Sequence, residues 1–426
     1  MPEFVHTVQP ATGLGLTAKT VSRNIGTVLF SFSWNSHMRP HSLLPALSVA
    51  VFILLSVVAC AQPGPGPARV EPLLENAASA TGPGEETGIR VRTLLEWLQE
   101  PWGMDFLPDG RLLLTEKPGT LKVVTPETWR TTDVSGVPAV ADEGQGGLMD
   151  VLVHPDFERN HWVYLSYAVA VEGGFTTRVS RARLRGTALE DFEVLFTARP
   201  AYAERRHFGS RLLLDRGLLY ITVGDRGNRE KAQSLLTHNG KVLRLTEDGR
   251  IPDDNPFVGR DDALPEIYSY GHRNPQGMAR RPGTREIWVT EHGPQGGDEI
   301  NIIKPGANYG WPVITYGEEY GGGAIGEGVH KDGMEQPLIY YVPSLGTGGI
   351  AFYDLNTYPG WNASLLVSGL RLARINRLEL DASGKPGKET RLLGNLGMRV
   401  RDIQVGPDGL VYALADRSRL IRLEPR

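Results

Sequence analysis

Residues 410–423, LVYALADRSRLIRL, contain the pattern that decides the fold. An apolar run begins at Leu410, and a second run with alternating arginines follows and ends at Leu423. The turn sequence Pro407-Asp408-Gly409 comes directly before the first run. Short runs rich in Val, Ile, Leu and Tyr that are bounded by such turns are typical of β-strands. The stretch therefore predicts two strands joined by a short turn.

The same unit recurs irregularly along the chain from Gly88 onward. Six copies cover residues 111–124, 151–184, 212–245, 286–303, 364–380 and 410–423. Successive copies begin at least 40 residues apart, a longer period than the coil of a solenoid, which has about 20–29 residues. We therefore predict an all-β protein, a six-bladed β-propeller, in which the strand from Ile89 to Leu95 completes the last blade. A β-sandwich pair and a β-helix are the alternatives. In a propeller, loops from every blade meet at one end of the central channel, so distant residues can form one pocket.

Composition and charge narrow the class of protein. The chain has 426 residues, with 51 Gly, 30 Pro, one Cys and a net charge of -4. This balance argues against a general nucleic-acid binder, which needs a basic face to neutralise phosphates. A single cysteine excludes a disulfide scaffold and any site with several cysteine ligands.

The N-terminal part has the features of an export signal. A mildly basic start at Met38 precedes the apolar run from Leu43 to Ala59, which ends at Cys60. The ending resembles the lipobox at which bacterial lipoproteins are cleaved and lipidated. An uncleaved anchor or a buried free thiol is the alternative. We expect a periplasmic or cell-surface lipoprotein held by Cys60.

Four segments follow from this interpretation. Residues 1–37 lack signal character and are expected to be an extension upstream of the natural start; residues 38–60 are the signal peptide. Residues 61–87 form a Pro/Gly/Ala-rich tether, and residues 88–426 form the propeller. Without residues 1–59, Lys plus Arg falls from 45 to 42 and Asp plus Glu from 49 to 48, so the net charge becomes -6.

Several arginines lie in polar, Gly-rich strings between the expected strands. Arg273 and Asn274 lie in Gly271–Gly277, Arg371 follows the strand LLVSGL, and Arg399 and Arg401 share one side of a strand by the period-two rule. If these arginines converge, the site suits a multiply anionic ligand, because guanidinium binds carboxylate or phosphate in a bidentate fork. The alternative for each one alone is a solvated or ion-paired surface arginine.

The loop from Glu291 to Glu299 combines carboxylates, His292 and main-chain carbonyls in a Gly/Pro-rich sequence. Calcium takes six to eight oxygen ligands, including main-chain carbonyls, so a hard-cation site is one interpretation. A structural turn whose acids cap neighbouring amides is the other. Zinc is disfavoured, because the loop has no thiolate and no second histidine.

His207 precedes an expected strand and is close to Gly209, which permits close approach. Such a histidine is a candidate general base, although a lone histidine is more often a hydrogen-bonded structural residue. Gln145 lies on another Gly-rich loop and can donate to a ligand oxygen, or it is an ordinary turn amide.

Taken together, these strings resemble a known family, the PQQ-dependent soluble aldose sugar dehydrogenases, which are relatives of soluble quinoprotein glucose dehydrogenase. The resemblance covers nearly all of the chain from Leu98 to Pro425 and rests on eleven strings in the family's order. They are GQGGLMDVLVHPDF, HFGSRLLLD, GDRGN, GKVLRL, DDNPF, YGHRNPQGMA, TEHGPQGGDEIN, GANYGWP, GMEQPL, PSLGTGGIAFY and RVRDIQVGPDG. The family is a six-bladed propeller, which agrees with the count of units.

The resemblance implies roles for the residues around the cofactor. His207 matches the base that takes the proton of the sugar's anomeric hydroxyl, and Arg273 matches the residue that polarises the quinone oxygen of PQQ. Asn274 and Gln145 match their neighbours around cofactor and substrate. The remaining cofactor-binding positions are Arg399 and Arg401, which match the pair that holds PQQ carboxylates, Arg371, which stands where the glucose enzyme has Lys, and His292, which stands where it has Gln.

The resemblance also implies calcium. Gly293 and Pro294 match main-chain carbonyl ligands of the calcium beside the cofactor, and Glu299 and the carbonyl of Tyr309 match a second, structural calcium site. Arg206 is a departure, because the glucose enzyme has Asp at this position beside the base. The loss of that carboxylate puts the orientation of His207 and the substrate contacts in doubt.

The resemblance thus implies an enzyme that oxidises aldoses at C1 to aldonolactones and passes the electrons to an external acceptor, a quinone or cytochrome. No nucleic-acid partner is expected, and membrane contact is expected only through the lipid on Cys60. Two other functions stay open: a calcium-dependent propeller lactonase or hydrolase, and a non-catalytic carbohydrate-binding propeller.

Overall fold

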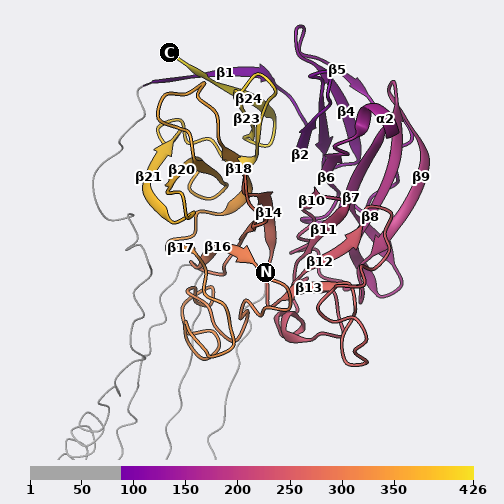
Figure 1. The fold of residues 1–426 in the computed structure, drawn as a ribbon, viewed down its shortest axis with the longest axis vertical. Helices are drawn as coiled ribbons and strands as arrows, with labels where there is room; N and C mark the ends of the chain where they lie inside the picture. The colour runs from indigo at the N-terminus through magenta and orange to yellow at the C-terminus, as the bar shows by residue number, and fades with distance from the viewer. Residues whose placement is uncertain (1–87) are drawn as a thin grey trace, which may run out of the picture. The chain divides into compact units, whose positions relative to one another are not determined.

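The structure is a computed structural model, and it describes residues 88–426 as a ring of six four-stranded antiparallel sheets (Figure 1). The predicted six-bladed β-propeller is confirmed. The extension, signal peptide and tether predicted for residues 1–87 lie outside the described residues. Among residues 88–426, no helix is long and apolar enough to cross a membrane.

Each blade is a meander whose four strands pair in sequence order. Blade 1 has β2 (Pro101–Phe106), β3 (Leu112–Glu116), β4 (Thr120–Thr125) and β5 (Arg130–Asp133). Blade 2 has β6 (Leu148–Val153), β7 (Trp162–Val171), β8 (Gly174–Arg185) and β9 (Ala188–Thr197), with the one-turn helix α2 (Phe157–Asn160) between its first two strands. Blade 3 has β10 (Leu212–Asp215), β11 (Leu218–Val223), β12 (Lys241–Thr246) and β13 (Ile267–Tyr270), with the short 3-10 helix η2 (Arg229–Gln233).

The second half of the ring repeats this plan. Blade 4 has β14 (Pro275–Arg280), β15 (Ile287–Glu291), β16 (Asp298–Ile303) and β17 (Ile339–Tyr341). Blade 5 has β18 (Thr347–Tyr353), β19 (Ser364–Gly369), β20 (Arg374–Leu380) and β21 (Pro386–Leu392). Blade 6 has β22 (Val400–Val405), β23 (Val411–Ala415), β24 (Arg419–Pro425) and, from the other end of the chain, β1 (Ile89–Leu95).

The ring closes through blade 6. Strand β1 pairs antiparallel with β24, with Ile89 opposite Pro425 and Thr93 opposite Ile421. In Figure 1, β1 lies beside β24 near the C-terminus. The prediction that residues 89–95 complete the last blade is therefore confirmed, and this pairing joins the two ends of the propeller in one sheet.

The apolar cores lie between neighbouring blades, because each sheet buries both faces. Blades 1 and 2, for example, share a cluster that contains Leu113, Leu121, Leu148 and Leu165, and a corresponding cluster fills each of the other five interfaces. All four leucines are at most 1% exposed. The blades thus form one continuous support for the loops at the ends of the ring.

The first strands of the blades contact one another in the order β2, β6, β10, β14, β18, β22 and back to β2, so they form the inner ring. Glycine permits their close approach. A Cβ atom at Gly277 would meet Thr290 Oγ1 at 2.2 Å and the Gly348 carbonyl at 2.3 Å, and one at Gly349 would meet Asp402 at 2.0 Å. The expectation that the whole string Gly271–Gly277 is a loop is wrong, because Pro275 already pairs with Glu291 in β14.

Candidate active site

A cavity of about 580 Å³ brings together most of the predicted site residues. Its lining includes ten of them: Gln145, His207, Arg273, Asn274, His292, Gly293, Pro294, Arg371, Arg399 and Arg401. Glu299 and Tyr309 instead line a separate, much smaller cavity of about 10 Å³. The predicted residues Gln145 and Arg401, which are 256 positions apart along the chain, therefore share one pocket.

The lining residues come from two kinds of connection. Gln145, His207, Arg273 and Arg399 lie in the segments that lead into the inner strands β6, β10, β14 and β22. The stretch from His292 to Pro294 lies between β15 and β16, and Arg371 lies between β19 and β20. Because the blades repeat the same meander, these connections converge on one end of the ring, as is usual for propeller sites.

Four arginines converge on this pocket without a carboxylate partner. Among the residues that the structure describes, none forms an ion pair with Arg273, Arg371, Arg399 or Arg401. Arg273 Nη1 donates to the carbonyls of His292 and Gly293, at 3.2 and 2.8 Å, but its buried Nε has no partner. The convergence that the sequence left conditional is thus observed, and the group of arginines suits a multiply charged anion.

The surroundings of Arg401 carry an excess of positive charge. Burial, together with the positive charges of Arg211 and Arg399, lowers the pKa of Arg401 to about 10. The Arg401 guanidinium also lies 5.8 Å from the ring of Trp102 in the pocket lining. A multiply charged anion bound here would offset this repulsion and restore the pKa of Arg401.

His207 is held at the pocket by both its backbone and its ring. Its backbone has a φ of 55°, in the left-handed region, and its N–H donates to Gln145 Oε1 at 2.8 Å. His207 Nδ1 lies 2.7 Å from Asp225 Oδ1, while Asp225 Oδ2 accepts from Trp311 Nε1 at 2.8 Å. Because the carboxylate accepts the Nδ1 proton, Nε2 of the neutral ring is the free acceptor.

Burial lowers the pKa of His207 below its usual 6.5; Asp225 raises it in part, and Arg273 and Arg206 lower it further. Burial alone would raise the pKa of Asp225, but the hydrogen bond from His207 and the positive charges nearby outweigh burial, so the pKa is lowered below 3.8. Near neutral pH the pair is therefore a neutral imidazole oriented by a carboxylate, which is the state that a general base needs.

The structure answers one of the two questions raised by Arg206, the orientation of His207. Asp225, which follows β11 in the string GDRGN, supplies the carboxylate that orients His207 from a different part of the chain. Asp225, Trp311 and the pocket residue Gln276 are functional candidates that were not predicted from the sequence. A polar residue directly after an apolar strand was the available signal for Asp225.

The carbonyls predicted to bind calcium at the pocket are only partly available. The Gly293 carbonyl accepts from Arg273, while the Gly293 N–H donates to Asp298 Oδ1 at 2.9 Å. A carbonyl oxygen has a second lone pair, but a guanidinium beside it disfavours a cation. Gly293 and Pro294 therefore suit calcium in combination with an anionic ligand rather than alone.

The smaller cavity has space for about one water-sized particle. Burial and the neighbouring negative charge of Glu291 raise the pKa of Glu299, which lines this cavity, to about 8. Glu291 is occupied by His272 Nδ1 and by the Arg273 N–H, at 2.8 and 2.7 Å. No group of three or more His, Cys, Asp or Glu side chains in residues 88–426 could hold a metal, so a cation beside Glu299 would need main-chain oxygens such as that of Tyr309.

Comparisons with known proteins place the chain among sugar dehydrogenases. Residues 98–422 match the family model described as Glucose / Sorbosone dehydrogenase. The aldose sugar dehydrogenase YliI of Escherichia coli K12 is 40% identical over 347 residues, which cover 79% of this chain and 93% of the relative. A crystal structure of a glucose dehydrogenase is 44% identical with a TM-score of 0.77, covering 78% of this chain and 99% of the other. The PQQ-bound aldose sugar dehydrogenase of Streptomyces coelicolor is 29% identical with a TM-score of 0.66, covering 81% and 100%.

Proposed function

The chain belongs to the glucose/sorbosone dehydrogenase family, and on that premise we propose that it is a PQQ-dependent dehydrogenase that oxidises aldose sugars at C1 to aldonolactones. The observation that carries this proposal is the group of arginines without carboxylate partners: Arg273, Arg371, Arg399 and Arg401 around one cavity. PQQ is a tricarboxylate, so it supplies the negative charge that this pocket lacks. The PQQ-bound relative and the buried, unpartnered Nε of Arg273 support the assignment.

When bound, PQQ would supply the hydride acceptor. The proposed contribution of this chain is the proton transfer: His207 Nε2 accepts the proton of the anomeric hydroxyl as the hydride leaves C1 and the carbon–oxygen bond at C1 becomes a double bond. The Asp225 carboxylate at Nδ1 stabilises the imidazolium that forms. The cavity that surrounds His207 holds sugar and cofactor together, which converts their reaction into a unimolecular step.

Arg273, Asn274 and calcium complete the proposed site. Arg273 lines the pocket, is held by the carbonyls of His292 and Gly293, and would donate to the developing negative charge on the cofactor. Asn274 Oδ1 accepts from the Gly209 N–H at 3.1 Å, so Asn274 also holds the loop of the base. The carbonyls of Gly293 and Pro294 would hold calcium, which would act there as a Lewis acid, and Glu299 with the Tyr309 carbonyl would hold a second, structural calcium.

We also propose that the protein is exported and anchored through a lipid on Cys60, and that an external quinone or cytochrome reoxidises the cofactor. The support is the sequence alone: the basic start, the apolar run and the cysteine that follows it. Cell fractionation of wild type and Cys60→Ala tests this proposal. Release of the variant from the membrane fraction is expected, and an unchanged distribution would contradict it.

The test of the function is dye-linked aldose oxidation by the purified apoprotein, with and without PQQ and calcium. Activity is expected only when both are supplied. His207→Ala should abolish turnover while PQQ still binds, and retained turnover would exclude His207 as the base. Absence of both activity and PQQ binding would contradict the proposed function and return the lactonase and binding-module hypotheses to consideration.

A further inference from the structure

Gln276, in the inner strand β14, lies between two side chains of the pocket. Its Oε1 accepts from Arg401 Nη1 at 2.8 Å and lies 2.9 Å from His292 Nε2. Gln276 is 6% exposed and lines the pocket itself. One amide oxygen therefore connects Arg401, from blade 6, with His292, from blade 4.

This contact fixes the state of all three groups. A guanidinium can only donate, so the atom that faces Arg401 must be the amide oxygen and not the amide nitrogen. His292 must then donate to the same oxygen from Nε2, which leaves its Nδ1 as the acceptor nitrogen.

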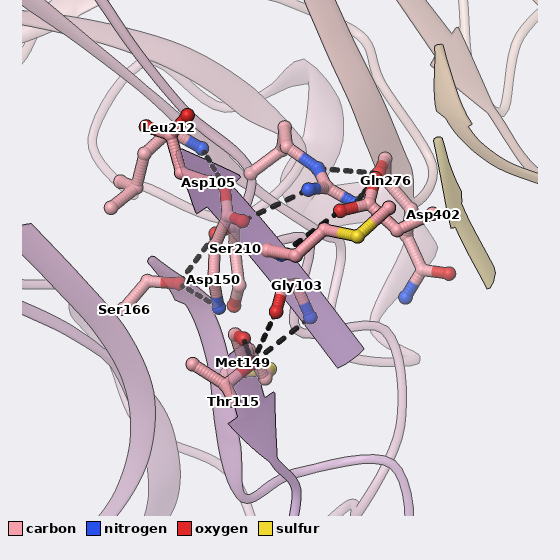
Figure 2. Close-up of polar contacts among 12 residues, drawn as sticks. Gly103, Asp105, Thr115, Met149, Asp150, Ser166, Ser210, Leu212, Gln276 and Asp402 are labelled. Carbon is pink, nitrogen blue, oxygen red and sulfur yellow. Dashed lines mark hydrogen bonds and ion pairs between the residues drawn. The ribbon is translucent and has the colours of Figure 1, made fainter. Parts of the chain in front are cut away.

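The backbone of Gln276 is held from the opposite side by an axial cluster, which we define as Arg211, Asp150 and Asp402. Arg211 Nε donates to the Gln276 carbonyl at 3.0 Å, and its Nη1 and Nη2 pair with Asp150 and Asp402 at 2.9 and 3.1 Å. Figure 2 shows Asp150, Asp402 and Gln276 in this region, with dashed lines for the hydrogen bonds and ion pairs between the residues drawn. All three side chains of the cluster are at most 6% exposed.

The cluster is itself fixed by the inner strands. Asp150 Oδ2 accepts from the Leu212 N–H at 2.8 Å, and Asp402 Oδ2 accepts from the Met104 N–H at 3.2 Å. Through these bonds the cluster joins blades 1, 2, 3, 4 and 6. Gln276 thus has its main chain attached to the rigid axis of the ring and its side chain turned toward the pocket.

We propose that Gln276 is a positioning residue of the cofactor pocket: its amide oxygen, backed by the axial cluster, holds the Arg401 guanidinium and the Nε2–H tautomer of His292 in the geometry that receives the cofactor. This inference rests on the proposed function, and it adds a residue with no assigned role. The Arg401 side chain has no ion pair in the part of the chain that the structure describes, so this bond is the one hydrogen bond of its guanidinium there. Without it, the long side chain would have to lose its rotamer freedom when the cofactor binds.

The first test is a PQQ titration of the calcium-loaded apoprotein, followed by quenching of tryptophan fluorescence. Gln276→Met preserves the length of the side chain but removes the acceptor, and a dissociation constant at least about tenfold higher is expected. Gln404→Met is the matched control, because Gln404 lies in an inner strand, β22, but does not line the pocket. An unchanged affinity of Gln276→Met would overturn the proposal.

A double-mutant cycle tests whether Gln276 acts through Arg401. If it does, Gln276→Met should weaken PQQ binding little in an Arg401→Met background, so the two effects should be clearly non-additive. Additive effects would show that Gln276 acts independently of Arg401 and would contradict the proposal.

A third measurement needs no cofactor and therefore separates this proposal from the proposed function. The 15N shifts of His292 in the histidine-labelled apoprotein should show the Nε2–H tautomer in wild type and in Gln404→Met, and should lose that preference in Gln276→Met. A wild type with the expected tautomer that binds no PQQ would contradict the proposed function and not the contact of Gln276 with His292. A wild type with the Nδ1–H tautomer would overturn the positioning role.

Discussion

At the scale of single residues, His207 depends on groups that the chain brings to it from elsewhere. Asp225 fixes its tautomer, Gln145 accepts from its N–H, and Trp311 in turn donates to Asp225. None of these three residues is a sequence neighbour of His207. The base is therefore a property of the assembled ring end rather than of the string that contains it.

Asp225→Asn should separate orientation of the base from binding of the cofactor. An asparagine can turn its NH2 toward Nδ1, which favours the wrong tautomer, so we expect kcat to fall about 10² to 10⁴-fold. PQQ affinity should stay within about threefold, because Asp225 does not line the pocket. Steady-state kinetics and PQQ titration check this, with the exposed Asp262→Asn as the control. A kcat equal to that of wild type would exclude the orienting role.

The protonation of His207 gives a prediction with a definite sign. Because burial and nearby cations lower its pKa below 6.5, the ring in the apoprotein should take up a proton only below that pH. Arg273→Met removes one of those cations and should move the midpoint up, while Asp225→Asn removes a stabilising charge and should move it down. NMR titration of the imidazole measures each midpoint. A wild-type midpoint above 6.5, or shifts of the opposite sign, would contradict this account.

At the scale of elements, the inner strands differ from the others because they must approach both their neighbours in the sheet and the next blade. Gly277→Ala should destabilise the protein by about 1–3 kcal/mol, since its Cβ would overlap Thr290 and the Gly348 carbonyl in a packed region. Gly387→Ala in the exposed strand β21 is the matched control, because its nearest neighbour would be the Glu379 carbonyl at 3.6 Å. Urea unfolding should show a lower midpoint for the first variant only. Equal midpoints would show that the inner ring tolerates added volume.

The difference between the inner strands and the other strands explains which strands could be predicted from the sequence. The second strand of each blade is rich in apolar residues and the third mixes apolar with polar residues. The predicted units fall on these two strands: residues 410–423, for example, contain β23 and most of β24. Inner strands such as β14, PQGMAR, and β18, TGGIAFY, have the glycines and polar residues of loops, and the outer strand β5 is exposed throughout. Periodicity alone therefore could not identify them.

In the candidate site too, some residues could be predicted from the sequence and others could not. The ten predicted residues that share one pocket were identified from ordered strings that resemble the family. Their spacing along the chain alone did not identify them. Asp225 meets His207 where two connections of blade 3 come together, and Gln276 joins blade 4 to blade 6, so neither contact follows from spacing along the chain. A single sequence gives no measure of which loop faces which.

At the scale of the whole molecule, closure of the ring concentrates buried carboxylates around its axis. Asp105 lies near Asp150 and Asp402, and within residues 88–426 Arg211 of the axial cluster is the one cation that pairs with the latter two. Asp105 instead accepts from the Phe106 and Val153 N–H groups, at 2.8 and 2.7 Å. Burial raises the pKa of Asp105 to about 7, and the negative charges of Asp150 and Asp402 add to this effect. The two hydrogen bonds lower the pKa but do not outweigh burial.

A raised carboxyl pKa makes global stability depend on pH in a direction opposite to that of a surface ion pair. Between the unfolded value of 3.8 and about 7, the folded protein keeps a proton that the unfolded chain releases. The free energy of unfolding should therefore fall as pH rises through this window, by up to about 4 kcal/mol from Asp105 alone. Asp105→Asn removes the titration, so its unfolding free energy should change less between pH 4 and 7 than that of wild type. Urea unfolding across this range measures the difference, with the exposed Asp253→Asn expected to follow wild type. Parallel curves for Asp105→Asn and wild type would mean that Asp105 keeps its charge in the folded ring, and the axis would then have to stabilise three carboxylates with one arginine.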